Sequence, residues 1–152
     1  MTGNKLFLTF LVSVYVVFSG FTQEGGKNLP PHAIINASYA GDEKTVKAIL
    51  AAGEVDIDVR DALGGTALHA ATFQSNLIVI KLLLDYGFNP NIRAEKNGNT
   101  PLHYAVASSN AGAVRLLLQY GASKNIRNLE GLTPLEKSRR EGKSEITRIL
   151  SR

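Results

Sequence analysis

An internal repeat of 33 to 34 residues is the feature that most constrains how this chain folds. Gly64–Gly87 reads GGTALHAATFQSNLIVIKLLLDYG, and Gly98–Gly121 reads GNTPLHYAVASSNAGAVRLLLQYG. The two segments start 34 residues apart and align without a gap. A third segment starts at Gly131, and a degenerate first one covers Ala33–Gly53. Because a unit of this length cannot bury its apolar face alone, the period predicts a stack of similar units with a shared core.

Local signals predict two helices in each unit. A threonine oxygen can accept from the free amides of a first helical turn, and the N-cap candidates are Thr66, Thr100 and Thr133. A proline at N1 loses no hydrogen bond there, and Pro101 and Pro134 follow two of these threonines. Glycines that accept a left-handed conformation end the second helices, at Gly53, Gly87 and Gly121. Each unit is therefore expected to be a helix, a turn, a second helix and a protruding hairpin-like loop.

The period and the order Thr-Pro-Leu-His, found in full at 100–103, resemble the ankyrin repeat. The outer units depart from this pattern, with Ile35 and Glu136 at the histidine position, as the caps of an open stack do. The resemblance covers about residues 30–152 and implies an all-α ankyrin-repeat solenoid of about four helix-turn-helix units with protruding hairpin loops. The expected repeats are about 32–60, 61–94, 95–127 and 128–152.

The segment before the repeats has a different composition. Residues 6–21 read LFLTFLVSVYVVFSGF and follow a single cation, Lys5, a pattern typical of a cleaved secretory signal peptide over residues 1–22. Residues 23–31 are rich in glycine and proline and are expected to form a linker. The apolar run is slightly shorter than the usual membrane span of about 17–25 residues, and an uncleaved anchor through residues 6–21 is the alternative.

The export pattern and the family resemblance together favour a bacterial source, because most eukaryotic ankyrin-repeat proteins work in the cytosol or nucleus. The chain contains no cysteine, which suits the periplasm, where stray thiols are oxidised. We therefore expect a periplasmic or secreted monomer, with anchoring in the inner membrane as the alternative.

Two histidines are the obvious candidates for catalysis or metal binding. His69 and His103 occupy the same position in adjacent repeats. Packed helices lie about 8–10 Å apart, whereas metal–nitrogen bonds are about 2 Å, so these imidazoles should not share an ion. The resemblance implies instead a structural residue that hydrogen-bonds between the loop and the first helix.

Other chemistry-bearing patterns are weak. Asp56, Asp58 and Asp61 alternate as calcium ligands do, but the run lacks the glycine and terminal glutamate of an EF-hand loop, which favours a solvated loop. No nucleophile–base pair, metal set or phosphate-binding loop stands out in the sequence. The chain is therefore predicted to be no enzyme and to need no cofactor.

The resemblance implies that partners bind at the loop tips and the exposed side of the first helices. Aligning the repeats places seven candidate partner-binding residues there: Tyr39, Leu63, Phe73, Gln74, Asn97, Asn99 and Arg140. Tyr39, Leu63 and Phe73 resemble an interface hot spot, although packing against neighbouring helices is the alternative. We predict a protein–protein interaction module that inhibits, protects or scaffolds a periplasmic or envelope protein through its concave face.

Charge is distributed unevenly along the chain. Residues 24–95 hold six Lys or Arg and nine Asp or Glu, whereas residues 96–152 hold ten and four. The basic last unit supports an alternative function, the binding of an anionic polymer or a host protein through the C-terminal repeat. Mixed signs and the lack of interleaved aromatics favour instead a polar cap that keeps the stack soluble, and nucleic acid is not an expected partner.

Overall fold

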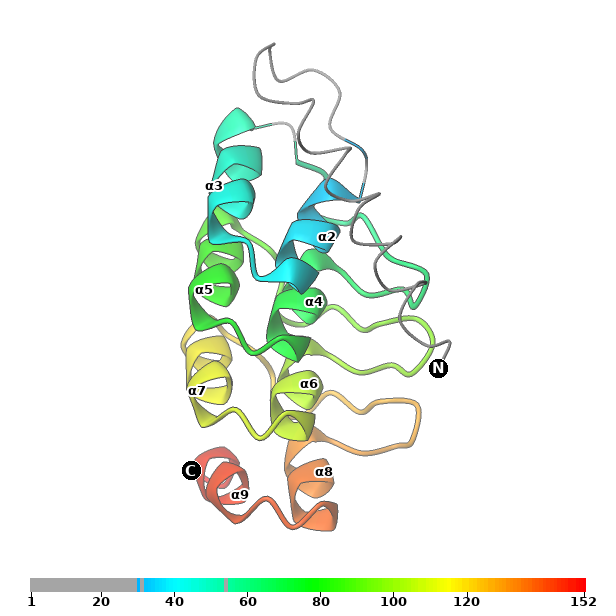
Figure 1. Ribbon diagram of the computed structural model, residues 1–152. Coiled ribbons are helices and arrows are strands. Elements are labelled where there is room, and N and C mark those ends of the chain that lie inside the picture. The colour runs from blue at the N-terminus through cyan, green and yellow to red at the C-terminus, as the bar shows by residue number, and fades with distance from the viewer. Residues whose placement is uncertain (1–29, 31, 54) are drawn as a thin grey trace, which may run out of the picture.

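The computed structural model describes residues 30, 32–53 and 55–152, and within them the chain forms eight α-helices and no strand (Figure 1). The helices are α2 (Ala33–Ala40), α3 (Glu43–Ala52), α4 (Ala67–Phe73), α5 (Leu77–Tyr86), α6 (Pro101–Ala107), α7 (Ala111–Gln119), α8 (Pro134–Arg140) and α9 (Ser144–Leu150). The predicted signal peptide and all of the predicted linker except Pro30 lie outside the described residues.

The helices stack in two parallel rows. In Figure 1, α2, α4, α6 and α8 form one row and α3, α5, α7 and α9 form the other. The loops that connect successive helix pairs project to the same side of the stack, beyond the first row. The prediction of an all-α stack of helix pairs with protruding loops is confirmed.

Short polar motifs start the helices. Thr66, Thr100 and Thr133 are the N-cap residues of α4, α6 and α8, and Pro101 and Pro134 are the first residues of α6 and α8. Three of the four second helices are capped by side chains that were not predicted from the sequence. Asp42, Asn76 and Asn110 accept from backbone amides in the first turns of α3, α5 and α7.

Glycines end α3 and α5 as predicted, because Gly53 and Gly87 have φ values of 74° and 110°, in the left-handed region. Helix α7 ends one residue earlier than its counterpart, at Gln119. Its C-cap residue is Tyr120, and the left-handed conformation falls on Gly121, with φ 82°.

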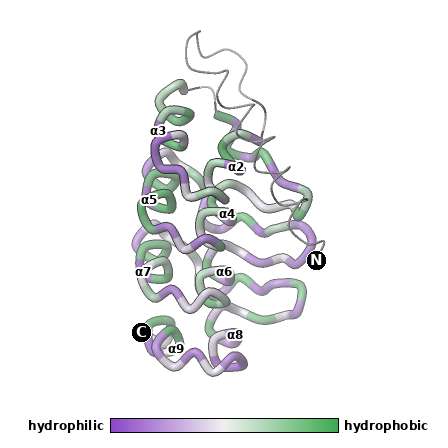
Figure 2. The backbone as a smooth tube through the Cα atoms, in the orientation of Figure 1, coloured by the Kyte–Doolittle hydropathy of each residue, from purple (hydrophilic) through white to green (hydrophobic). Residues whose placement is uncertain are grey.

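The core lies between the two rows of helices. One apolar position recurs in all four second helices and is at most 5% exposed in each, at Ile49, Leu83, Leu117 and Leu150. The position before it in the sequence is only partly buried in three units, at Leu82, Leu116 and Ile149, and Ala48 is exposed. In Figure 2, most of the green, hydrophobic segments lie in the helices, whereas α8 and the turns between the two helices of a unit are largely white or purple.

The described helices are short. None of the helices within residues 30, 32–53 and 55–152 has the length and apolar character needed to cross a membrane. The alternative of an anchor through residues 6–21 concerns a segment outside this range.

Candidate functional site

In each of the two central units, one buried histidine connects the first helix to the loop of the next unit. His69 Nδ1 accepts a hydrogen bond from the Thr66 amide at 3.1 Å, and its Nε2 lies 3.2 Å from the Asn99 carbonyl. His103 repeats the arrangement, with the Thr100 amide at 3.2 Å and the Leu132 carbonyl at 2.9 Å. The tautomer that satisfies both contacts carries its proton on Nε2.

These contacts occupy both ring nitrogens of each histidine. Burial lowers the pKa of His69 to about 4 and also lowers the pKa of His103, so both rings are neutral near pH 7. The geometry gives the two histidines a role in joining helix to loop rather than in proton transfer. In the described part of the chain, no group of three or more acidic or histidine side chains is placed to hold a metal ion.

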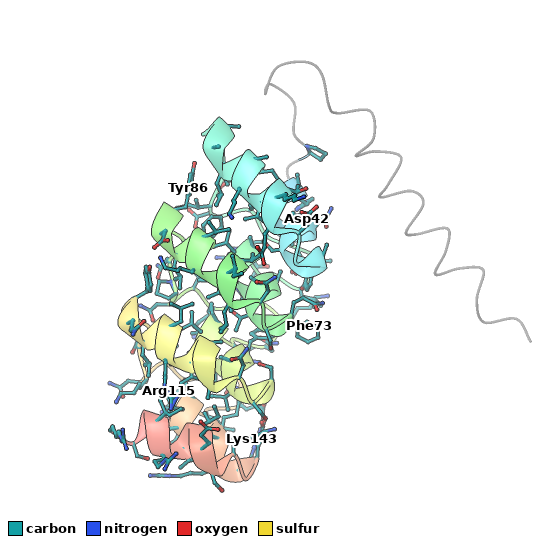
Figure 3. All side chains as sticks on the ribbon, turned by 60° about the vertical axis from the view of Figure 1, so that its left-hand side comes forward. Asp42, Phe73, Tyr86, Arg115 and Lys143 are labelled. Carbon is teal, nitrogen blue, oxygen red and sulfur yellow. The ribbon has the colours of Figure 1, made fainter. Side chains whose placement is uncertain are left out.

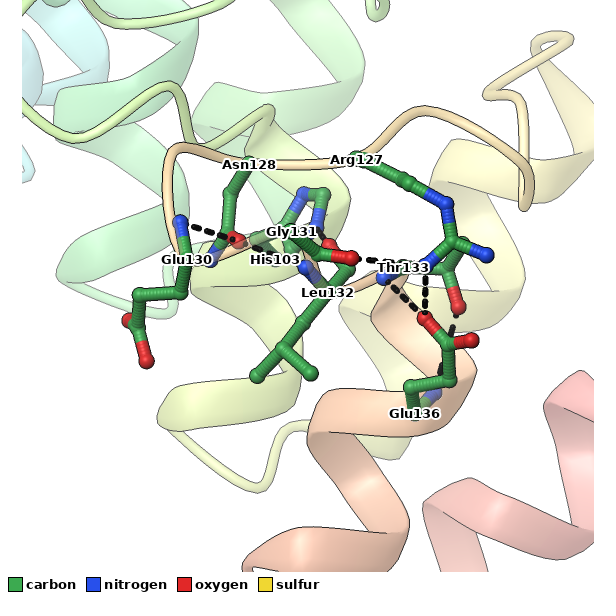
Figure 4. Close-up of polar contacts among 8 residues, drawn as sticks. All are labelled: His103, Arg127, Asn128, Glu130, Gly131, Leu132, Thr133 and Glu136. Atoms are coloured by element: carbon green, nitrogen blue, oxygen red, sulfur yellow. Dashed lines mark hydrogen bonds and ion pairs between the residues drawn. The ribbon is translucent and has the colours of Figure 1, made fainter.

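Glu136 takes the histidine position in the last unit. Its carboxylate accepts from the Thr133 amide at 2.8 Å, which preserves the contact that caps the helix. Its second polar partner is Arg127, at 2.6 Å, instead of a carbonyl in a following loop (Figure 4). Replacing the histidine by glutamate at this position therefore preserves the hydrogen bond that caps α8, but the contact with a following loop is replaced by an ion pair with Arg127.

A row of three aromatic rings crosses the first helices; we call Tyr39, Phe73 and Tyr104 the aromatic row. The Phe73 ring lies edge-on between the tyrosines, with centroids 6.4 Å from each. Phe73 is nevertheless 60% exposed, while both tyrosines are partly buried. The tyrosines therefore hold a phenylalanine that presents most of its surface to solvent.

Both tyrosine hydroxyls bind to the protruding loops. The Tyr39 hydroxyl donates to Asp61 Oδ2 at 2.9 Å, and the side-chain Nδ2 of Asn97 donates to the Tyr104 hydroxyl at 3.1 Å. Burial and the bond to Asp61 raise the pKa of Tyr39 to about 12. The aromatic row thus lies in the angle between the first helices and the loops.

Asp61 organises the first of these loops. Its Oδ1 accepts from the amides of Leu63 at 2.8 Å and Gly65 at 2.9 Å. Burial opposes ionisation of Asp61, but the hydrogen bonds from Gly65 and Tyr39 outweigh it and lower the pKa. The carboxylate that could have been taken for a calcium ligand is thus engaged in a turn, which holds Leu63 at the tip with half of its surface exposed.

The third loop has the same construction with an amide in place of the carboxylate. Asn128 Oδ1 accepts from the amides of Glu130 and Leu132, both at 3.0 Å (Figure 4). Arg127 closes the other side by donating to the Gly131 carbonyl at 2.6 Å. This loop is tied to the one before it, because Asn128 Nδ2 donates to Asn99 Oδ1 at 2.8 Å.

The seven residues predicted to bind a partner fall into three groups. Tyr39 and Phe73 belong to the aromatic row, and Gln74 is exposed next to Phe73. Leu63 lies at the tip of the first loop and is connected to the row through Asp61, which accepts from the Leu63 amide and from the Tyr39 hydroxyl. Asn97 and Asn99 lie in the second loop, where Asn97 Oδ1 accepts from the Asn99 backbone amide at 2.9 Å, and Asn99 Oδ1 links this loop to the third by accepting from Asn128 Nδ2. Arg140 lies on α8, at the C-terminal end of the stack, in an ion pair with Glu130.

Two residues of this face were not predicted from the sequence. Tyr104 completes the aromatic row, and Leu129 at the third loop tip is 64% exposed. A signal for Tyr104 was present, because the aligned positions hold the small Ala70 and the polar Lys137. Because the other units fold without an aromatic residue at this position, the Tyr104 ring indicates a role other than forming the repeat.

Comparison with known proteins agrees with this architecture. A family model described as ankyrin repeats (3 copies) matches residues 34–128, and the chain belongs to the ankyrin-repeat family. A search of curated proteins found no match. Ankyrin repeats generally mediate protein–protein interactions and are typically non-enzymatic. The α8–α9 pair lies beyond the matched residues and continues the stack.

Proposed function

We propose that this protein is an exported, non-enzymatic binding module that holds a protein partner against the aromatic row and Leu63. The observation that carries the proposal is the 60% exposure of Phe73 between two tyrosines that are themselves fixed to loops. A ring held in place loses little conformational entropy on binding, and aromatic residues dominate the energy of many interfaces.

The chemistry of the face defines the partner's surface. Phe73 and Leu63 offer apolar area, and the exposed Gln74 offers polar contacts beside it. A complementary partner presents an apolar side chain that fits between the first helices and the loops. Binding there would inhibit, protect or scaffold the partner, depending on which of its surfaces is covered.

The place of action is part of the proposal. Residues 1–22 have the composition of a secretory signal peptide, and the absence of cysteine suits an oxidising compartment. We therefore place the partner in the periplasm, in the envelope or outside the cell.

Site-specific crosslinking tests the interface. A photo-crosslinking amino acid replaces Phe73 in one variant and Tyr86 in a matched control. Both are exposed aromatic residues at helix ends, and they lie on different sides of the α4–α5 pair (Figure 3). We expect one defined protein adduct from position 73 in the source cell and none from position 86. Equal adducts from both positions, or adducts from neither, would contradict the assignment.

Affinity for the crosslinked partner gives the second readout. Truncating a hot-spot side chain costs about 2 kcal/mol or more, so Phe73→Ala should weaken binding roughly 30-fold. Tyr86→Ala should leave the dissociation constant unchanged. Neither residue is in the buried core, so circular dichroism should show both variants folded.

Cell fractionation tests export separately. We expect a soluble periplasmic or secreted form whose mass corresponds to loss of about residues 1–22. A full-length protein in the membrane fraction would support the anchor instead, and a full-length cytosolic protein would refute export.

A further inference from the structure

The basic residues of the last third of the chain divide into paired and unpaired sets. All four carboxylates of residues 96–152 are in ion pairs, which are Arg115–Glu145, Arg127–Glu136, Lys137–Glu141 and Arg140–Glu130. Six cations of this region have no carboxylate within 4 Å among the described residues: Lys96, Lys124, Arg139, Lys143, Arg148 and Arg152. The ion pairs therefore do not neutralise the excess positive charge of this end.

Two of the unpaired arginines line one pocket. The pocket lies between α8 and α9, is open to solvent, measures about 410 Å³ and is lined by Arg139, Gly142, Ser144, Thr147 and Arg148. Lys143, another unpaired cation, lies in the turn that joins the two helices (Figure 3). None of the five lining residues is an acidic residue, so nothing in the lining opposes an anion.

The hydroxyl groups of the pocket differ in what they can donate. Ser138 Oγ donates its only proton to the Leu135 carbonyl at 2.7 Å, so the 2.8 Å contact between Ser138 and Thr147 uses the Thr147 proton. Thr147 therefore presents no donor to the pocket. Ser144 makes no side-chain hydrogen bond within the described residues, which leaves its hydroxyl proton available.

We propose that the pocket between α8 and α9 is a binding site for a phosphate group held by Arg139, Arg148 and Ser144. Each guanidinium can donate two parallel N–H bonds to an oxyanion, and the serine hydroxyl can donate a third contact from a different direction. Two guanidinium groups and a hydroxyl can together contact several phosphate oxygens, and two cations suit the near-double charge of a phosphate better than the single charge of a carboxylate. Because the pocket is open, the phosphate can remain attached to a larger molecule.

This site is separate from the face proposed to bind protein. The aromatic row lies on α2, α4 and α6, whereas the pocket lies on α8 and α9. Either proposal can therefore fail without affecting the other.

Nuclear magnetic resonance on the isotope-labelled full-length protein tests the site. Inorganic phosphate is titrated at constant ionic strength while the Arg139 and Arg148 Nε–H signals and the Ser144 amide are followed. Acetate serves as the carboxylate probe. Linear polyphosphate separates the two sources of the group, because a polymer-borne phosphate should bind more tightly than the free ion and a free-phosphate site should not show this gain.

Two double variants provide the matched comparison. Arg139→Gln with Arg148→Gln removes the two pocket charges, and Lys96→Gln with Arg152→Gln removes two exposed charges elsewhere. Since the pocket variant loses the charge-assisted hydrogen bonds of both arginines, it should bind phosphate about tenfold more weakly or worse, and the control should bind as the parent does. The Arg139→Lys with Arg148→Lys variant should be intermediate, because it keeps the charge and loses the paired donors.

Three outcomes would overturn the proposal. The first is a response to phosphate that does not saturate. The second is equal weakening in the pocket and control variants, which would show attraction by net charge alone. The third is acetate binding as tightly as phosphate, which would show that the site does not select a phosphate group.

Discussion

The His69 ring joins three parts of the chain. Its Nδ1 caps α4, its Nε2 contacts the carbonyl of Asn99 in the next loop, and the ring packs nearly perpendicular to the Tyr104 ring, with centroids 5.6 Å apart. Protonation of Nδ1 would remove the acceptor for the Thr66 amide and place a charge in a buried site. The stability of the protein should therefore depend on this residue remaining neutral.

The folded state lowers the pKa of His69 from about 6.5 to about 4, so its contribution to stability is complete above pH 6.5. Between pH 6.5 and pH 4, the histidine is protonated in the unfolded state but remains largely neutral in the folded state. The free energy of unfolding should fall by up to about 3 kcal/mol between pH 6.5 and pH 4. Urea denaturation at several pH values measures this slope.

His69→Gln is the control for this prediction. A glutamine at this position can accept from the Thr66 amide in a capping box but cannot titrate. The slope between pH 6.5 and pH 4 should be reduced in this variant. Carboxylates such as Asp42 and Asp61, whose pKa values are lowered, lose their contribution at lower pH and do not produce the same slope. A parent slope that persists unchanged in the variant would assign it to other groups.

The asparagines before the second helices connect neighbouring elements. Asn76 Oδ1 accepts from the amides of Ile78 at 3.0 Å and Val79 at 3.1 Å, while its Nδ2 donates to the Gly41 carbonyl at 3.3 Å. Asn110 repeats both contacts one unit later, with Ala113 and with Ser75. Each asparagine side chain thus caps the first turn of a second helix and hydrogen-bonds to the turn between the two helices of the preceding unit.

Asn76→Ala should destabilise the protein by about 1–2 kcal/mol, because it removes the cap of α5 and the link to Gly41 together. Gln74→Ala is the matched change two residues away, where an exposed side chain makes no hydrogen bond within the described residues, and it should stay within about 0.5 kcal/mol. Chemical denaturation of both variants gives the comparison. Equal stabilities would show that water replaces the asparagine cap.

Features that recur in each repeat could be predicted from the sequence, whereas contacts between particular side chains of different helices could not. The threonine caps, the proline positions and the core position of Leu83 and Leu117 follow from the repeat, since each recurs in the same local setting. Tyr104 does not follow from it. Tyr104 and Phe73 are 31 residues apart, which is not a multiple of the period, and their contact depends on how one helix is placed beside the next. The α8–α9 pocket likewise depends on side chains from two helices of a single unit.

The whole molecule is a one-dimensional stack. Each first helix packs against its neighbours in the row, as α4 does against α2 and α6, and each second helix does the same. The last pair, α8 and α9, has such neighbours on one side only within the described chain. In a stack of this kind, stability is a sum of unit and interface contributions, so the end unit can open alone.

Removing a core leucine should therefore have different effects at the end and in the middle. Leu150→Ala and Leu83→Ala each remove a side chain that is at most 2% exposed, at a cost of about 2–5 kcal/mol. We expect Leu150→Ala to speed amide hydrogen exchange mainly in α8 and α9. Leu83→Ala should speed it across α2 to α7. Identical exchange patterns in the two variants would indicate that the stack unfolds only as one unit.

Two glycines lie where neighbouring loops come close together. A Cβ on Gly64 would lie 2.4 Å from the Glu95 side chain, and one on Gly98 would lie 2.8 Å from the Leu129 amide nitrogen. Both glycines also have positive φ values, 73° and 67°. Neighbouring loops are thus closer at these two positions than a residue with a side chain would permit without a shift. Two hydrogen atoms, one on each glycine Cα, therefore occupy the places where any side chain would push the loops of adjacent units apart.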